Sequence, residues 1–504
     1  MFVKLNSAFV LGIEAQHISV EIDSLRGLPA ISMIGLAEGA AKESKDRVRS
    51  ALINSGVNIP PKKITINLAP ADIKKQGSGF DLAIGVGLAL VSGIKIEHRG
   101  YMFASELSLD GHLHYIKGIF PISILAKQRN LKLIVSRENV EEAVLGGASV
   151  YGFDTLIEVL DFLAGTKDKQ PEKRDREIVG YPNYDVDFAD VKGQLKAKRA
   201  AEIAASGFHN ILFIGPPGAG KSMIAKRIPT ILPLMSESEI LETTRIYSAA
   251  GLLNKNNPIM ASRPFRAPHH TSSDVSLIGG GSDAKPGEVT LATNGVLFLD
   301  ELPEFKRNVI EVLRQPLEDG YITVSRAKLK VKYPAFFMLV AAMNPCPCGN
   351  YGSKRKECTC SFQQIKRYRN RVSGPILDRI DLHVNVPEVD YEDISSSKLS
   401  SQSSEKIRAR VEQVRDIQNK RFKGDNINYN AQMLQRHLRK YCRLDDESNK
   451  ILKAAMDRFG LSARSYSKTL KIARTIADMD GSDNITSKHI KEAVSYRTLD
   501  MDNL

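Results

Sequence analysis

The sequence has little cysteine and no long apolar run. Five cysteines in 504 residues do not make a disulfide scaffold. The longest nearly apolar run, residues 82–94, is too short to span a bilayer, which needs about 20 apolar residues. Residues 1–16 lack the charged n-region, continuous apolar h-region and small-residue cleavage site of a signal peptide. We therefore expect a cytoplasmic protein with no membrane partner.

Basic residues outnumber acidic ones, with 71 Lys and Arg against 58 Asp and Glu and a formal net charge of +13. This excess favours a polyanionic partner, either nucleic acid or nucleotide phosphate, although a merely basic soluble protein would have the same composition. The hydrophobic fraction of 42% and the charged fraction of 26% are those of a globular protein and exclude wholesale disorder. The length suggests about three domains.

The chain divides into three regions by pattern. Residues 1–165 mix short apolar strands with helical periods, which indicates an α/β or α+β domain. Residues 166–185 are charged and contain prolines, as expected of a linker. Strands and helices alternate again in residues 186–390, with several glycine-rich loops, which predicts a second α/β domain with a parallel sheet. After a serine-rich linker, residues 403–504 have mainly helical periods and predict a small helical domain.

The strongest motif is a glycine-rich loop of the GxxxxGK[ST] type between an apolar run and a helix-compatible run. The loop consists of Gly215, Pro216, Pro217, Gly218, Ala219, Gly220, Lys221 and Ser222. Glycines let backbone N–H groups converge on phosphate oxygens, and the helix that follows adds the positive end of its dipole. Lys221 supplies a cation for the β- and γ-phosphates, and Ser222 supplies a hydroxyl ligand for Mg²⁺. The loop therefore predicts ATP binding.

Two later apolar runs end in polar residues that complete such a site. Residues 295–299 lead into Asp300 and Glu301. Asp300 can hold the magnesium ion, and Glu301 can orient and deprotonate the attacking water. Residues 336–343 lead into Asn344, whose amide can hydrogen-bond the water or the γ-phosphate and matches the sensor-1 position of AAA+ ATPases. The chain is therefore predicted to be an ATPase.

Two arginines are candidates for two further functional positions of AAA+ ATPases, the arginine finger and the sensor-2 arginine. Arg379 is interpreted as an arginine finger that reaches the γ-phosphate of a neighbouring subunit, with Arg371 as the nearby alternative. A local ion pair at a helix end would also explain Arg379. In the helical region, Arg464 fits a sensor-2 arginine, with Arg474 as the alternative on the same helix.

Four of the five cysteines lie within residues 346–360, as two CxC pairs. They are Cys346, Cys348, Cys358 and Cys360. Four thiolates in a short loop can close a tetrahedral zinc site, although four free or redox-active thiols remain the alternative. The adjacent His269 and His270 lack a neighbouring carboxylate pattern, so they are interpreted as part of an inserted loop and not as metal ligands.

Two basic segments are predicted to contact DNA. Residues 320–334 alternate apolar and basic residues, which predicts a β-hairpin that carries Arg326 and Lys328. The cysteine loop supplies Lys354, Arg355 and Lys356. Further cations and aromatic residues follow or lie among them: Tyr351, Phe362, Lys366, Arg367, Tyr368, Arg369 and Arg371. Cations with aromatics suit phosphate contact and base stacking, although a solvated charged surface would have the same composition.

Together these motifs closely resemble the magnesium-chelatase-like AAA+ proteins of the YifB/ComM type. The resemblance rests on GPPGAGKSM, RPFRAPHHTSSDVSLIGGG, PGEVTLATNGVLFLDELPEF, AAMNPCPCG and SGPILDRIDLHV in the ATPase region, and on segments of both flanking regions. It covers essentially the whole chain. It implies an α/β protein with an N-terminal Lon-protease-like α+β domain, a central AAA+ P-loop α/β domain and a C-terminal helical lid domain. It also implies a hexameric, ATP-driven DNA helicase that promotes branch migration during natural transformation.

The Lon-like resemblance raises the question of peptidase activity. In an ungapped alignment, the position of the catalytic serine is Gly79, with Ser78 one place away, and the position of the catalytic lysine is Ile122. A serine without its base is not a nucleophile. We therefore expect an inactive domain with a structural or DNA-contacting role.

The leading hypothesis is an ATP- and Mg²⁺-dependent motor on single-stranded or branched DNA, assembled as a hexameric ring. The alternative is an ATP-dependent protein remodeller or chaperone of the MoxR or magnesium-chelatase type, which would use the same nucleotide site. An active ATP-dependent protease is opposed by the apolar residue at the lysine position.

Overall fold

The computed structural model spans residues 1–504 and describes all of them except 71–74, 76, 175–177, 181–183, 282–284, 327–328, 354, 390–401 and 498–504. The chain forms two compact units. Unit 1 consists of Met1–Val179, Glu237–Ala261 and Ser282–Pro286, and unit 2 of Gly180–Ser236, Ser262–Gly281 and Gly287–Leu504. Within the described residues, every helix is too short or too polar to cross a membrane.

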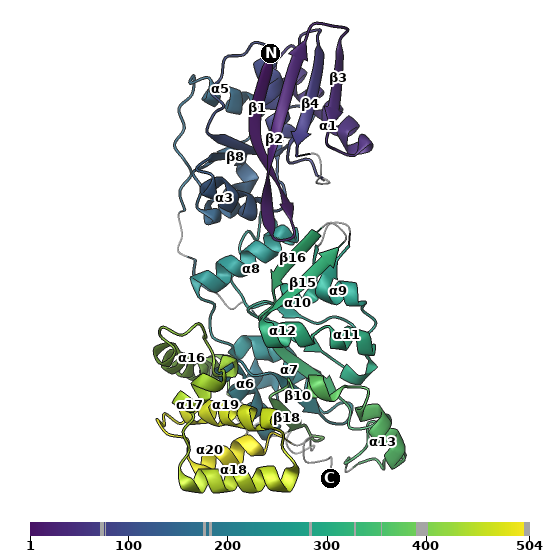
Figure 1. The fold of residues 1–504 in the computed structure, drawn as a ribbon, viewed down its shortest axis with the longest axis vertical. Coiled ribbons are helices and arrows are strands. Elements are labelled where there is room, and N and C mark those ends of the chain that lie inside the picture. The colour runs from purple at the N-terminus through teal and green to yellow at the C-terminus, as the bar shows by residue number, and fades with distance from the viewer. Residues whose placement is uncertain are drawn as a thin grey trace. The chain divides into compact units, whose positions relative to one another are not determined.

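A seven-stranded mixed sheet forms the centre of unit 1 (Figure 1). Its strands, in spatial order, are β3 (Ala30–Ile34), β4 (Lys63–Ala69), β2 (Glu14–Leu25), β1 (Phe2–Leu11), β5 (Tyr101–Ala104), β8 (Lys132–Ser136) and β9 (Val150–Phe153). Strand β2 is antiparallel to both of its neighbours, and the other pairs are parallel. Alternate residues of β4 are buried, as expected of a strand with one face on a core. The short strands are β6 (Glu106–Leu107), β7 (Leu113–His114) and β13 (Lys285–Pro286).

The helices of unit 1 pack on this sheet or on one another. They are α1 (Glu38–Asn54), α2 (Asp81–Val91), α3 (Ile119–Gln128), α4 (Val140–Ala143), α5 (Leu156–Leu163) and α8 (Glu237–Ala249), with 3₁₀ turns η1 (Arg137–Asn139) and η2 (Val144–Gly146). Every residue of α2 is buried, because this nearly apolar run packs against β1 and β2.

Helix α8 belongs to unit 1, although it lies between two elements of unit 2 in the sequence. It packs on α3, and Ser248 Oγ donates to Glu142 Oε1 over 2.5 Å. The hydroxyl of Tyr115 donates to Glu142 Oε2 over 3.0 Å and lies 3.3 Å from the carbonyl oxygen of Leu253 in the same segment. The central domain predicted from the sequence, residues 186–390, includes this segment, and its boundaries stay a prediction.

Unit 2 contains a five-stranded parallel sheet, as the alternation of strands and helices predicted. Its order is β11 (Phe265–Arg266), β14 (Val296–Leu299), β17 (Met338–Met343), β10 (Ile211–Ile214) and β18 (Leu382–Asn385). All residues of β10, β14 and β17 are buried, which is typical of central strands covered on both faces. A separate antiparallel hairpin joins β15 (Tyr321–Arg326) to β16 (Leu329–Pro334), and β12 is Gly279–Gly280. The hairpin expected in residues 320–334 therefore forms.

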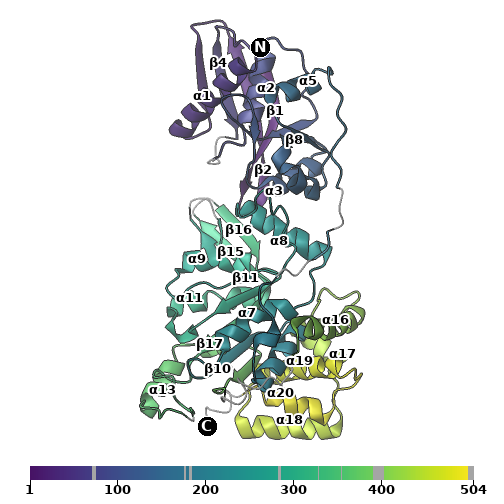
Figure 2. The ribbon, with the colours of Figure 1, turned by 180° about the vertical axis from the view of Figure 1, so that it is seen from behind.

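The helices of unit 2 fall into two groups. Those of the ATPase region are α6 (Leu195–Gly207), α7 (Lys221–Ile231), α9 (Asp274–Ile278), α10 (Glu288–Leu291), α11 (Arg307–Glu311), α12 (Arg314–Asp319), α13 (Phe362–Arg369) and α14 (Gly374–Leu377), with η3 (Phe188–Asp190) and η4 (Leu302–Glu304). Those of the C-terminal region are α16 (Ser404–Arg421), α17 (Gln435–Tyr441), α18 (Asp446–Phe459), α19 (Ala463–Met479) and α20 (Ser487–Val494), with η5 (Asn430–Gln432). The second group gathers beside α6, drawn in olive to yellow in Figures 1 and 2.

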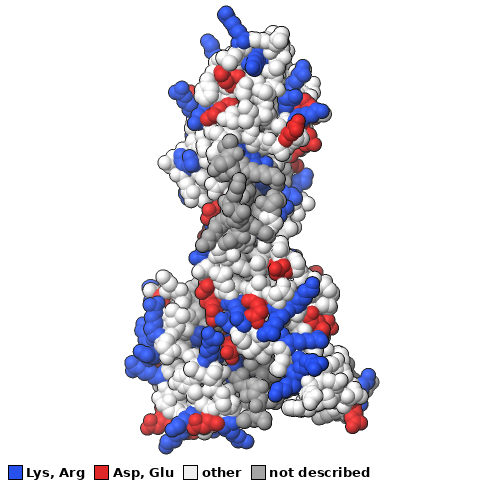
Figure 3. All heavy atoms as spheres, turned by 45° about the vertical axis from the view of Figure 1, so that its right-hand side comes forward, with Lys and Arg blue, Asp and Glu red and all other residues white. Residues whose placement is uncertain are grey.

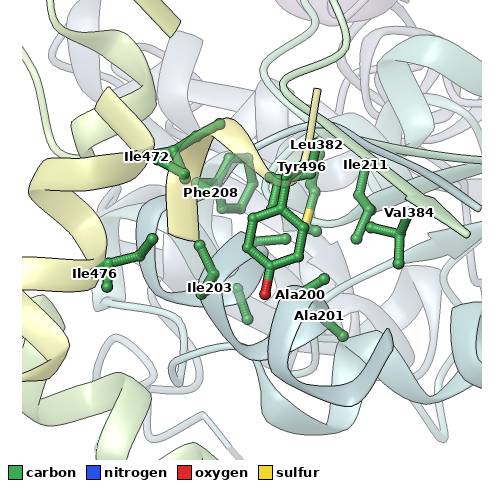
Figure 4. Packing of buried hydrophobic residues seen from close by; sticks show 14 of the residues in the cluster. Ala200, Ala201, Ile203, Phe208, Ile211, Leu382, Val384, Ile472, Ile476 and Tyr496 are labelled. Atoms are coloured by element: carbon green, nitrogen blue, oxygen red, sulfur yellow. The ribbon is translucent and has the colours of Figure 1, made fainter. Parts of the chain in front are cut away.

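One hydrophobic core joins the C-terminal helices to the ATPase region. Figure 4 shows Tyr496 among Ala200 and Ile203 of α6 and Leu382 of β18, and Ile472 of α19 beside Phe208. Buried polar contacts reinforce this junction. Lys468 Nζ lies 2.7 Å from Asp381 Oδ1, and Arg497 donates to the carbonyl of Ile380 over 2.9 Å. The position of α19 relative to the start of β18 is therefore fixed by packing and by charge.

Candidate nucleotide-binding site

The glycine-rich loop runs from the end of β10 to the start of α7. Gly218 and Gly220 have φ of +78° and +88°, where residues with a side chain are strained. A Cβ atom at Gly215 would lie 2.1 Å from the carbonyl oxygen of Val386, so only glycine fits there. The loop therefore exposes backbone amides at the N-terminus of an 11-residue helix, which is a favourable place for phosphate.

Lys221 extends into this loop and is 8% exposed. Its ammonium donates to the carbonyls of Gly215 and Pro216, over 2.6 and 2.9 Å. Burial lowers the pKa of Lys221, while the nearby carboxylates of Asp300 and Glu301 act in the opposite direction. The cation is thus held where the sequence analysis expected phosphates to bind.

Ser222 and Asp300 meet across the ends of α7 and β14. Ser222 Oγ donates to Asp300 Oδ2 over 2.6 Å. A hydroxyl and a carboxylate oxygen at this separation are hard ligands of the kind that Mg²⁺ prefers, so the pair fits the predicted magnesium site.

Asn344 follows the last residue of β17, the strand between β10 and β14. Its Oδ1 accepts a hydrogen bond from Lys221 Nζ over 3.1 Å. The carboxyl ends of parallel strands meet at one edge of a sheet, and for this reason residues distant in sequence converge here. The structure thus brings together Lys221, Ser222, Asp300 and Asn344.

Glu301 has a contact that the sequence analysis missed. Its Oε2 atom lies 3.4 Å from Nδ1 of His270, and its side chain is 54% exposed. The carboxylate that His270 contacts thus comes from a distant part of the sequence, and the interpretation of His269 and His270 as part of an inserted loop stays a prediction. The rings of the two histidines lie 4.1 Å apart, and His270 also contacts the ring of Phe305 edge-on. No spacing in the sequence signals this pairing, because the fold of the loop after β11 creates it.

Arg379 and Arg464 lie at the opposite edge of the sheet. Both arginines face Glu318: Arg379 forms an ion pair with it, and Arg464 Nη2 lies 3.7 Å from its Oε1. The carbonyl of Arg379 accepts a hydrogen bond from Asn210, the residue before β10, whereas the phosphate loop follows the other end of that strand. About 16 Å of extended chain separates these two ends. The two arginines border a cavity of about 590 Å³.

The two alternative arginines have different surroundings. Arg474 is 2% exposed and donates to Asp478 and to the carbonyls of Ser482 and Asp483, so its contacts lie inside the helical region. Arg371 is half exposed and donates to Glu304 over 2.9 Å. Because Glu304 closely follows Glu301, Arg371 lies toward the carboxyl edge of the sheet.

The basic segments are only partly described. Lys328 and Lys354 lie outside the described residues, as does the side chain of Arg326. Arg355 donates to the carbonyl of Val389 over 2.7 Å, and Lys356 is exposed. On the face shown in Figure 3, Lys and Arg form scattered groups separated by neutral and acidic side chains.

Helix α13 carries both exposed cations and an exposed aromatic residue. Ile365 and Tyr368 are buried, whereas Lys366 and Arg367 are exposed. Phe362, at the start of the helix, is 77% exposed. A cavity of about 790 Å³ is lined by Pro303, Glu304, Phe305, Arg307, Gln363, Lys366, Arg367, Asn370 and Arg371.

The protease-like positions of unit 1 do not form a comparable site. Ile122 is 2% exposed within α3, and a Cβ atom at Gly79 would lie 3.3 Å from Ile116. The hydroxyl of Ser78 donates to Glu106. The position of the catalytic lysine in the alignment is therefore occupied by a buried isoleucine.

Comparisons with known proteins match three consecutive parts of the chain to families named for the magnesium-chelatase subunit ChlI. Residues 187–394 match the family described as magnesium chelatase, subunit ChlI, residues 20–139 match subunit ChlI of Mg-chelatase, and residues 401–497 match the C-terminal region of that subunit. The chain is 42% identical to competence protein ComM of Haemophilus influenzae over 497 residues, which cover 97% of this chain and 96% of the relative. It is also 42% identical to YifB of Escherichia coli over 493 residues, with the same coverage. The magnesium-chelatase 38 kDa subunit of Cereibacter sphaeroides is 25% identical over 31% of this chain and 52% of its own length.

Proposed function

Because the chain belongs to the YifB/ComM family of magnesium-chelatase-like AAA+ proteins, we propose that it is an ATP-driven motor acting on DNA in the cytoplasm. Membership of an AAA+ family indicates an ATPase that uses ATP and Mg²⁺ and that assembles with copies of itself. The proposed assembly is a hexameric ring, and the proposed substrate is single-stranded or branched DNA during recombination or natural transformation. The 42% identity to a relative named competence protein supports the proposed role in natural transformation.

The ATPase proposal rests on four side chains that lie close together: Lys221, Ser222, Asp300 and Asn344. Lys221 neutralises the β- and γ-phosphates, and the loop from Gly215 to Gly220 offers backbone amides to them. Ser222 and Asp300 would hold Mg²⁺, which would supply positive charge to offset the negative charge that develops on the phosphates. Glu301 orients the attacking water and accepts its proton, and Asn344 positions the water or the γ-phosphate. His270 fixes the carboxylate of Glu301 through its 3.4 Å contact.

The positions of Arg379 and Arg464 support catalysis between subunits. Both lie at the end of β10 that is distant from their own phosphate loop. An arginine there serves a nucleotide only if a neighbouring subunit presents its loop to that edge. A ring places each such edge beside the next loop, which is why the proposed motor is an assembly and not a monomer.

The exposed cations and the exposed aromatic ring of helix α13 favour DNA over a protein as the substrate. Lys366 and Arg367 suit phosphate contacts, and the exposed ring of Phe362 offers a stacking platform for an unpaired base. Arg326, Lys328, Lys354, Arg355 and Lys356 stay predicted contacts of the same kind. A structural zinc ion on the four clustered cysteines completes the proposed set of cofactors.

The proposal is tested by ATP hydrolysis in the presence of forked, single-stranded and linear duplex DNA. We expect stimulation by forked or single-stranded DNA and a loss of that stimulation in the double variant Lys366→Ala, Arg367→Ala, with basal hydrolysis unchanged. The matched control is Lys450→Ala, Lys453→Ala on α18, which removes the same charge from another exposed face. DNA affinity of the wild type should fall with salt, with a log–log slope of about −0.7 to −0.9 for each phosphate contact.

Failure to bind any of these DNAs at low salt would overturn the DNA motor in favour of the protein remodeller, whose nucleotide chemistry would be the same. Equal loss of stimulation in both double variants would overturn the assignment of α13.

A further inference from the structure

The four clustered cysteines have the geometry of a site for one metal ion. The Sγ atoms of Cys346, Cys348, Cys358 and Cys360 all lie within 4.8 Å of one another. Three of the separations are 3.4, 3.6 and 3.7 Å. Sulfurs around a tetrahedral zinc ion with bonds of about 2.3 Å are about 3.8 Å apart. A disulfide would need about 2.05 Å, so the thiols are arranged as ligands and not as oxidised pairs.

Backbone amides also point at these sulfurs. The N–H of Cys348 donates to Cys360 Sγ over 3.4 Å, and the N–H of Tyr351 donates to Cys346 Sγ over 3.3 Å. Such donors stabilise negative charge on sulfur, which is the form that binds metal. Among the described residues, these four thiols are the one group of at least three metal-binding side chains that could share an ion.

The cysteine loop lies directly against the phosphate loop. A Cβ atom added at Gly349, between the first two and last two cysteines, would lie 2.7 Å from Cδ of Pro217. At its start, the loop is continuous with Asn344, which accepts the hydrogen bond from Lys221. Arg369 of α13 donates to the carbonyl of Pro345 over 3.2 Å. The loop therefore contacts the phosphate loop at Pro217 and is joined through Pro345 to Asn344 of the nucleotide site.

Between Pro345 and Ser361, the described residues form no helix or strand. A segment without regular secondary structure has few backbone hydrogen bonds to hold its shape, and a metal ion can supply that order. From this arrangement we infer that the four cysteines bind one Zn²⁺ ion, and that the zinc-closed loop braces Pro217 and Asn344 in the shape that binds nucleotide. The inference rests on the proposed nucleotide site and adds a structural determinant of its affinity.

The metal is tested by elemental analysis of full-length protein purified without chelator. We expect about one zinc per chain and no iron. Exchange with Co²⁺ should give the intense near-ultraviolet bands of thiolate coordination. Cys348→Ser with Cys358→Ser should lose the metal, whereas Cys442→Ala, which changes the isolated buried cysteine, should keep it. Zinc below about 0.1 per chain, or iron in its place, would overturn the zinc assignment.

The brace is tested by two glycines of the same loop. Gly349 and Gly352 have φ of +83° and +79°, so alanine strains the backbone to a similar degree at both. Only at Gly349 does the added methyl meet Pro217, because Gly352 has open space. We expect Gly349→Ala to weaken binding of a fluorescent ATP analogue by ~10-fold and Gly352→Ala by less than ~2-fold, while both retain zinc.

The two alanine variants also remain informative if the cysteine variants fail to fold. Equal affinities in Gly349→Ala and Gly352→Ala would overturn the brace. Normal affinity in folded, zinc-free protein would do the same. These measurements use no DNA, so a loss of DNA stimulation alone would count against the proposed motor and not against the brace.

Discussion

Unit 1 and unit 2 both pack helices on a sheet with parallel strands, but among the described residues the side chains predicted to act on nucleotide gather at one sheet edge in unit 2, whereas the predicted protease positions of unit 1 do not form a catalytic pair. In unit 2, Lys221, Ser222, Asp300 and Asn344 come from three adjacent strands and lie within hydrogen-bonding distance of a neighbour. In unit 1, the protease-like positions hold Gly79 and the buried Ile122. Two similar layers of helices and strands therefore differ in function, because a catalytic site forms only where suitable polar residues follow the ends of the strands.

The largest effect should come from Lys221→Ala. The β- and γ-phosphates lose their cation, so ATP hydrolysis should fall to background, by at least ~10³-fold. Steady-state phosphate release and nucleotide titration measure this. Lys226→Ala is the matched control, because that exposed lysine lies on the same helix and should leave turnover within ~2-fold of the wild type. Equal losses in both variants would mean that α7 has been disrupted and that the phosphate-loop assignment is not supported.

Glu301→Gln should retain ATP binding and lose hydrolysis by roughly 10³-fold, because an amide cannot accept the proton of the attacking water. Single-turnover kinetics separates the two steps. Glu304→Gln, three residues further on, removes the partner of Arg371 and serves as the control. Turnover at the wild-type rate in Glu301→Gln would remove that residue from the role of base.

Arg379→Ala should bind ATP normally and hydrolyse it ~10²-fold more slowly. If the arginine acts on the neighbouring subunit, mixing this variant with Lys221→Ala should restore part of the activity, because some interfaces then join an intact arginine to an intact phosphate loop. Arg371→Ala should show no such complementation. An absence of rescue in rings that exchange subunits would refute a role between subunits.

His270→Ala should lower kcat by about tenfold while KM for ATP stays unchanged, because the carboxylate of Glu301 loses the group that orients it. His270→Asn, which keeps a polar group near the carboxylate, should recover part of the rate. His269→Ala removes the neighbouring ring, whose hydrogen bond goes to Thr271, and should change kcat by less than ~2-fold. Identical kcat values in His270→Ala and the wild type would show that the contact has no part in catalysis.

The smallest effect is expected in unit 1. Ser78→Ala should leave ATP hydrolysis within ~2-fold of the wild type, and neither protein should cleave a casein-type substrate with or without ATP. Ser78 donates to Glu106, and no lysine occupies the Ile122 position. ATP-dependent cleavage that Ser78→Ala abolishes would contradict the inactive interpretation of this unit and would weaken the contrast with unit 2.

The sequence predicted the class of the fold but not all of its connections. The parallel sheet and the helical C-terminal region are confirmed, because apolar runs with flanking glycines and long helical periods are local signals. The attachment of α8 to unit 1 had no such signal. It depends on packing against α3 and on the contact of Ser248 with Glu142, a residue more than one hundred positions away.

The sequence by itself determined the chemical inventory: the phosphate loop, the carboxylates after β14, Asn344 and the four cysteines are all readable from residue types and spacing. Only the tertiary structure decided which of these residues meet. It paired His270 with Glu301, placed Arg379 and Arg464 on one acidic partner, and set Gly349 against Pro217. Each of these contacts joins segments that are separate along the chain. Their proximity arises from strand order and helix packing, which no short sequence pattern encodes.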